Sequence, residues 1–85
     1  MKTRSLKVIL EEIGTKLRSL REKQGYDSIK EFANDNNLPM IQYWRIEKGK
    51  ANLTLKSLTK LLSIHSVSIE EFFCQADKKA RVAVR

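Results

Sequence analysis

The spacing of apolar residues in the first part of the chain constrains the fold more than any other feature. Apolar side chains recur every three or four positions from residue 6 to about residue 24, which predicts one long amphipathic helix. Gly25 suits the left-handed residue that ends such a helix. Gly14 should cost about 1 kcal/mol relative to Ala, so it either marks a close contact with a neighbouring helix or is simply tolerated. The apolar positions are Leu6, Ile9, Leu10, Ile13, Leu17 and Leu20.

Two short helices joined by a tight turn are expected next. Asp27 or Ser28 can cap the first, with Glu31 placed as in a capping box, and that helix should end near Asn36. The Asn36-Asn37 pair suits the turn, because Asn tolerates left-handed dihedral angles. The second helix covers residues 39–48, with a proline at its first helical position and a glycine after its end. Together they predict a helix-turn-helix over about residues 28–48. Ile29, Phe32 and Ala33 supply the inward side of the first helix.

Two more helices complete the expected chain. Thr54 can cap the fourth helix, and the His65-Ser66 pair should end it. Ser68 and Glu71 form a second capping box that opens the fifth. The sequence therefore predicts an all-α fold of five helices with a long first helix. The apolar positions of the fourth helix are Leu55, Leu58, Leu61 and Leu62, and Ile69, Phe72 and Phe73 of the fifth should close the core.

The chain is small and basic. Its 85 residues are enough for one domain, and a hydrophobic content of 41% supports a compact core without a metal or disulfides. Seventeen Lys and Arg against ten Asp and Glu give a formal charge of +7, which favours a polyanionic partner. The alternative is a solvated basic surface that only keeps the protein soluble. The basic tail, residues 74–85, could be a helix extension, a disordered arm or part of a dimer contact.

Membrane, secreted and catalytic roles find little support in the sequence. A single cysteine, Cys74, excludes an internal disulfide framework and favours a reducing compartment, here the cytoplasm. The sequence has no phosphate-cradling glycine loop, no His/Cys metal spacing and no nucleophile with an adjacent base, and its only histidine, His65, has no evident set of partners, so we expect no enzyme, no metal and no cofactor. No separate ligand-binding domain fits in this length, so no small-molecule ligand is expected either. No apolar run approaches the roughly 20 residues that cross a bilayer, and no signal-peptide stretch follows the first residues.

The helix expected over residues 39–48 combines apolar, amide and cationic groups. Helical spacing puts Tyr43 and Ile46 on its inward side, with the Tyr43 hydroxyl at the edge of the core. Trp44 is either a core anchor or partly exposed, and partial exposure is favoured because the inward side is already occupied. The outward groups can meet both base edges and phosphates. They are Met40, Ile41, Gln42, Trp44, Arg45 and Lys48.

Five segments form a pattern in their order and spacing. They are the Leu17-Arg18, Leu20-Arg21 and Gly25 ending of the first helix, Phe32-Ala33, Arg45-Ile46-Glu47-Lys48-Gly49-Lys50, Leu58 with Leu61-Leu62, and Ser68-Ile69-Glu70-Glu71-Phe72-Phe73. In this arrangement, residues 13–73 resemble the Cro/C1-type helix-turn-helix family, also called the XRE family, of bacterial and phage repressors. The resemblance covers most of the chain. It implies a lambda-repressor-like DNA-binding domain over residues 1–73.

The resemblance also implies a way of reading double-stranded DNA, with the second helix across the backbone and the third in the major groove. Met40, Ile41, Trp44 and Arg45 would then touch base edges or the adjacent backbone, with Gln42 as a further candidate. At the start of the third helix, however, Met40 and Ile41 replace the amide and hydroxyl side chains common in the family. Apolar groups can contact thymine methyls but cannot make the bidentate hydrogen bonds that distinguish adenine or guanine. Arg45 is then the main candidate for hydrogen-bonded specificity, or else an ordinary solvated arginine.

Further positions match the backbone-contacting and structural parts of the family pattern. Lys48, Gly49 and Lys50 match a loop that contacts phosphates, and a phosphate contact at Ser28 would match the start of the second helix. Arg21 and Glu47 match a pair that, in relatives, ties the first helix to the third. We expect this pair to be mainly structural, because truncating one side strands the other charge.

The expected function is sequence-specific DNA binding by a transcriptional regulator, most simply a repressor. A homodimer on a roughly palindromic site, with half-sites about 34 Å apart, would act by blocking or assisting polymerase. Its interface would use residues 64–73 with the tail, or the apolar residues 6–13. Two alternatives stay open: an antitoxin-like protein that binds a second protein, and a protein-interaction module that has kept the helix-turn-helix fold.

Overall fold

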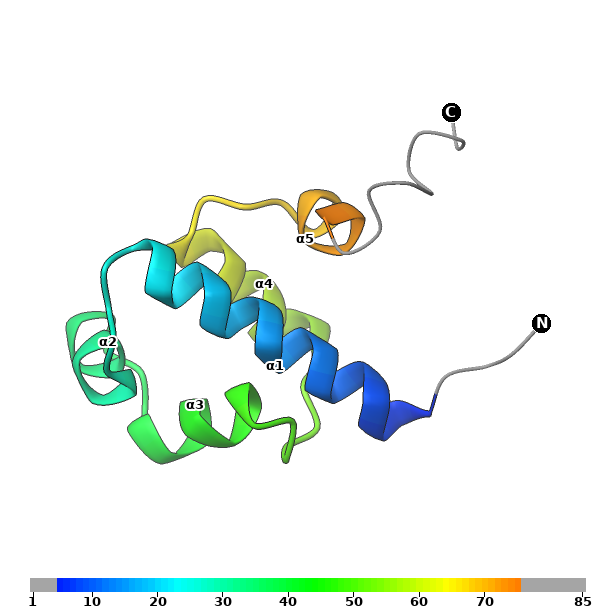
Figure 1. Ribbon diagram of the computed structural model, residues 1–85, viewed down its shortest axis with the longest axis horizontal. Helices are drawn as coiled ribbons and strands as arrows, with labels where there is room; N and C mark the ends of the chain where they lie inside the picture. Colours follow the sequence, from blue (N-terminus) through cyan, green and yellow to red (C-terminus); the bar gives the residue numbers. More distant parts are fainter. Residues whose placement is uncertain (1–4, 76–85) are drawn as a thin grey trace. The chain divides into compact units, whose positions relative to one another are not determined.

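A computed structural model describes residues 5–75, and in that range the chain forms five helices and no strand (Figure 1). The all-α class expected from the sequence is therefore confirmed. The chain divides into two compact units: the first ends at Leu53 and holds three helices, and the second begins at Thr54 and holds two. The helices are α1 (Leu6–Lys23), α2 (Ile29–Asp35), α3 (Met40–Glu47), α4 (Leu55–Ile64) and α5 (Ile69–Gln75).

Four of the helices begin with the side-chain caps that the sequence predicts or allows. The hydroxyl groups of Ser5, Ser28 and Thr54 accept hydrogen bonds from backbone N–H groups three residues later, at 3.2, 3.2 and 3.0 Å. Ser68 forms the full capping box with Glu71, with both bonds at 3.0 Å. The third helix, expected to begin at Pro39, begins one residue later. Pro39 is its N-cap, because ψ of 119° keeps this residue extended, and α3 begins at Met40.

The first four helices all end in the same hydrogen-bonded turn. The residue after the C-cap has a positive φ in each: Gly25 (95°), Asn37 (57°), Gly49 (72°) and Ser66 (57°). The N–H groups of this residue and of the next one return to the last helical turn, as in a Schellman motif. The predicted ends at Gly25, Gly49 and the Asn36-Asn37 pair are thus confirmed. The next residue is half-buried after α1, α2 and α4 (Tyr26, Leu38 and Val67) but is the exposed Lys50 after α3.

The first unit is organised around contacts between α1 and α3. A Cβ atom built on Gly14 of α1 would fall 2.8 Å from the Ile46 carbonyl oxygen and closer still to that of Glu47. Gly14 therefore marks a close helix contact, which decides between the two alternatives left by the sequence. Tyr26, Phe32 and Tyr43 form a row of aromatic rings with centroid separations of 5.3 and 5.1 Å. The buried apolar side chains of this unit are Ile13, Leu17, Phe32, Ala33 and Tyr43.

The second unit buries fewer of its apolar side chains than the sequence predicts. Its buried members are Leu58, Leu61, Leu62 and Phe72. The expectation that Phe73 closes the core is wrong, since it is 44% exposed, and Leu55, an apolar position of the expected fourth helix, is 69% exposed. Leu55 is the first residue of α4 and lies at the end of its apolar stripe, whereas Phe73 is turned about 100° from the buried Phe72 by the helical rotation.

The expectation of a single domain over residues 1–73 remains a prediction. The tail beyond Gln75 lies outside the described residues. Within residues 5–75, no helix has the length and apolar character needed to cross a membrane.

Candidate nucleic-acid interface

The turn between α2 and α3 is fixed by backbone hydrogen bonds. The Leu38 N–H donates to the Ala33 carbonyl at 2.8 Å, and the Asn37 N–H donates to Asn34 at 3.3 Å. The left-handed conformation of Asn37 reverses the chain here, as its Asn side chain predicts. The first unit thus contains two short helices, α2 and α3, joined by a tight turn, with α1 running beside α3 (Figure 1).

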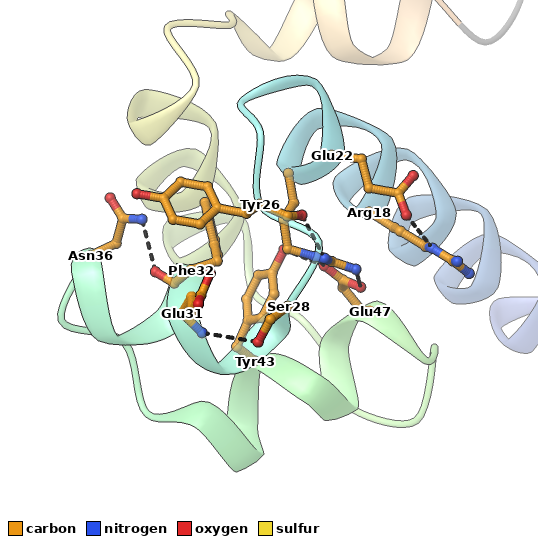
Figure 2. A network of polar contacts seen from close by, with 10 residues as sticks. Arg18, Glu22, Tyr26, Ser28, Glu31, Phe32, Asn36, Tyr43 and Glu47 are labelled. Atoms are coloured by element: carbon orange, nitrogen blue, oxygen red, sulfur yellow. Dashed lines mark hydrogen bonds and ion pairs between the residues drawn. The ribbon is translucent and has the colours of Figure 1, made fainter.

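A buried polar cluster holds the inner side of α3 against α1 (Figure 2). Arg21 donates from Nε to Glu47 Oε2 at 2.7 Å and from Nη2 to Oε1 at 3.1 Å. Its Nη1 donates to the Tyr26 carbonyl oxygen at 2.9 Å. Tyr43 donates its hydroxyl hydrogen to Glu47 Oε2 at 2.6 Å. The structure thus joins Arg21 and Glu47 in a two-pronged pair and adds Tyr43 as a third member.

The environment of this cluster favours one set of protonation states. Hydrogen bonding to Glu47 raises the pKa of Arg21, so the guanidinium stays charged. Burial, together with the hydrogen bond to Glu47, raises the pKa of Tyr43, so its hydroxyl stays protonated as a donor. The expectation that the Tyr43 hydroxyl lies at the edge of the core is wrong: the residue is 2% exposed. Its position four residues before Glu47 on one helix was the signal in the sequence for this bond.

The loop after α3 packs against α1 as closely as the helix does. A Cβ atom on Gly49 would lie 2.8 Å from Cγ and 2.9 Å from Cα of Glu11. Gly49 also has φ of 72°, which L side chains rarely adopt. Two independent constraints therefore require glycine at this position. As a result, contacts with α1 hold both the last turn of α3 and the loop that follows it.

The outer side of α3 is open to solvent and has an apolar patch, which we call the apolar tip. It consists of Met40, Ile41 and Trp44, which are 43%, 65% and 42% exposed. The expectation of a partly exposed Trp44 agrees with this value. Gln42 and Arg45 are also exposed. The outward positions predicted from helical spacing are therefore found on the outer side.

Cations gather at the C-terminal end of the same helix. The Lys50 N–H donates to the Arg45 carbonyl at 2.8 Å, and Arg45 Nη2 lies 3.5 Å from the Lys50 carbonyl oxygen. Lys48 Nζ lies 6.0 Å from the centroid of the Trp44 ring, at the limit of a cation–π contact. A helix C-terminus favours positive charge by itself. However, the only carboxylate between residues 40 and 50 is the buried Glu47, so the exposed charge of this segment is entirely positive.

Ser28 lies apart in sequence, at the start of α2, and is half-buried. Its Oγ accepts the Glu31 N–H at 3.2 Å (Figure 2), and this bond leaves the hydroxyl hydrogen available as a donor. The side chain thus caps α2 and can still donate to a phosphate oxygen. The structure groups Arg45, Lys48, Gly49 and Lys50 at one end of α3, and Met40, Ile41, Gln42 and Trp44 along its outer side.

No group of three or more His, Cys, Asp or Glu side chains within residues 5–75 is placed to hold a metal ion. Comparisons of the chain with protein-family models, with curated proteins and with solved structures give no match.

Proposed function

We propose that this protein is a sequence-specific DNA-binding transcriptional regulator of the lambda-repressor-like, Cro/C1 type, most simply a repressor. The observation that carries the proposal is the contrast around α3. Its only carboxylate is buried against Arg21, whereas Arg45, Lys48 and Lys50 lie exposed on the second helix of a helix-turn-helix and the loop after it. A surface of this kind suits a polyanion that is read by an inserted helix.

The contact with DNA that we propose for each residue follows from the chemistry of its side chain or backbone. Lys48, Lys50 and the backbone of Gly49 would contact phosphates and supply most of the affinity and its salt dependence. Arg45 would contact base edges, because its guanidinium can pair with guanine O6 and N7. A homodimer on a two-fold symmetric site would place its two α3 helices about 34 Å apart, which is one turn of the DNA double helix. This role would place the protein in the cytoplasm with the DNA.

Selection of bound duplexes from a random DNA pool at two salt concentrations tests the proposal. The wild type should recover a two-fold symmetric motif, and Arg45→Ala should lose the preference at one position of each half-site. Lys48→Ala and Lys50→Ala should weaken binding to all sequences and each lower the salt slope by about 1. The charge-preserving variant Lys50→Arg is the matched control and should keep the slope. Weak, motif-free binding that modest salt abolishes would overturn the proposal.

A second candidate function rests on the apolar tip. Exposed apolar groups on a short helix also suit a protein partner, as in an antitoxin-like protein or an interaction module that has kept the fold. The three cations beside the tip favour DNA over an apolar protein groove. If random-pool selection fails while Trp44→Ala disrupts a stable protein complex, this second function is the better account.

A further inference from the structure

The apolar tip is the part of the outer side of α3 that phosphate binding does not explain. Ile41 and Trp44 are three residues apart, and Met40 and Trp44 are four apart, so the three side chains are neighbours on the helix surface. Single exposed apolar residues are ordinary, but a cluster on one helix end marks a contact surface. A water-exposed cluster of this kind calls for a partner with apolar groups of its own.

The side chains of the apolar tip cannot be buried in the core by a rotation of α3. The inner side of α3 is filled by Tyr43, whose ring packs 5.1 Å from Phe32, and by Glu47, which Arg21 holds with two hydrogen bonds. A rotation of α3 that buried the tip would break these bonds and bring a carboxylate into solvent. The fold therefore keeps the tip directed outward.

The charges around the tip define its occupant. Lys48 Nζ lies 6.0 Å from the centroid of the Trp44 ring, and Arg45 follows Ile41 by one helical turn. Any partner that covers the tip must therefore also accept these cations. Major-groove DNA satisfies both demands, because thymine presents a C5-methyl group beside acidic phosphates. Among the four bases, only thymine carries a methyl group on its major-groove edge.

We propose that the apolar tip selects thymine, by packing Met40, Ile41 and Trp44 against C5-methyl groups in the major groove. This inference rests on the proposed function and names the sequences it would prefer. Half-sites should carry two or three thymines beneath the start of α3, next to the position read by Arg45. Discrimination at those thymines then comes from buried methyl groups, not from hydrogen bonds.

Replacement of thymine by deoxyuridine tests the inference, because it removes the methyl group and leaves every hydrogen-bonding atom in place. With the preferred duplex from the random pool, uracil at two or three positions should weaken binding about 4-fold each, the value expected for one buried methyl group. In Ile41→Ala, at least one of these positions should lose its uracil effect. This non-additivity would assign the methyl group to that side chain.

Leu55→Ala is the matched control. Leu55 is 69% exposed, like Ile41 at 65%, but lies at the start of α4. This variant should keep the wild-type response to uracil at every position. Thermal melting of each variant shows that the fold is intact before binding is compared.

The outcomes separate this inference from the proposed function. A selected motif whose binding weakens in Lys48→Ala and Lys50→Ala, but which shows no uracil effect, overturns the inference alone. An unchanged uracil response in all of Met40→Ala, Ile41→Ala and Trp44→Ala assigns the tip to another occupant, such as an acidic protein surface, and also overturns it. Absence of any motif overturns the proposed function, and this inference with it.

Discussion

The inner and outer sides of α3 differ in how completely the protein itself satisfies their side chains. On the inner side, Tyr43 and Glu47 are 2% and 7% exposed, and each makes a polar contact within the cluster. On the outer side, Ile41 is 65% exposed, and its neighbours Met40 and Trp44 are 43% and 42% exposed. Eight residues of helix thus contain one side fixed by the fold and one side that the fold leaves unused.

This difference predicts which residues of α3 determine stability and which are available for binding. Changes on the inner side should alter the free energy of unfolding, because buried polar groups and tight packing respond strongly to lost partners. Changes on the outer side should leave stability nearly unchanged and act on binding alone. Stability measurements on both sides can therefore test the assignment before any ligand is identified.

Arg21→Ala should have the largest effect and gives the strongest test of the inner side. Its removal leaves Glu47 as a buried carboxylate without a countercharge, hydrogen-bonded to the Tyr43 hydroxyl, and breaking a buried pair in this way typically costs about 3–5 kcal/mol. Chemical denaturation should show a loss of this size, with DNA affinity lost in parallel. The control is Arg18→Ala, whose ion pair with Glu22 has side chains 59% and 46% exposed and should contribute less than about 0.5 kcal/mol. Equal stability of the two variants would contradict a structural role for the buried pair.

Gly14→Ala tests the contact that brings α1 against α3. The added Cβ would meet the backbone carbonyls of Ile46 and Glu47, which cannot move as a flexible side chain can. We expect a loss of about 1–3 kcal/mol in the free energy of unfolding, even though Ala is the better helix former. Ser19→Ala, at an exposed position of α1, is the control and should be neutral or slightly stabilising. A Gly14→Ala variant as stable as this control would mean that the helices are farther apart.

Local patterns predicted the ends of the helices, because their causes lie within a few residues. Ser28 caps α2 through a bond three residues away, and Gly25 ends α1 with its own dihedral angles. Long-range features were less accessible. Gly14 was ambiguous because its contact lies on a helix more than 30 residues later. The burial of the Tyr43 hydroxyl depends on Arg21, which lies 26 residues before its partner Glu47 in the sequence.

The sequence predicted which side chains of α3 lie on its outer side, but not the contacts that they make. Helical period alone put Met40, Ile41 and Trp44 on the outer side, since Tyr43 and Ile46 define the inner one. Period does not say whether another part of the chain reaches the end of a helix, so the 69% exposure of Leu55 at the first residue of α4 was not predictable. What the outer side binds is an intermolecular property, which no intrachain spacing contains.

Tyr43→Phe should sharpen the comparison through the pH dependence of stability. Loss of the bond to Glu47 should cost about 1 kcal/mol at neutral pH. Because the folded state raises the pKa of Tyr43, the folded protein retains a proton that the unfolded chain loses above about pH 10. Wild-type stability should therefore fall above pH 10 by up to about 1.4 kcal/mol per pH unit from this group. The variant should show a smaller slope in urea denaturation, whereas an identical slope would place the hydroxyl in solvent.

Ile41→Ala should have the smallest effect on stability and gives the sharpest test of the outer side. An aliphatic side chain that is 65% exposed buries little surface, and Ala gains a few tenths of a kcal/mol in helix propensity. The free energy of unfolding should therefore stay within about 0.5 kcal/mol of the wild type. Leu17→Ala in α1 is the buried comparison: Leu17 has no exposed surface and its truncation should cost about 2–5 kcal/mol. If Ile41→Ala instead lost more than about 1 kcal/mol, Ile41 would be packed within the fold, and it could not meet a base in the major groove.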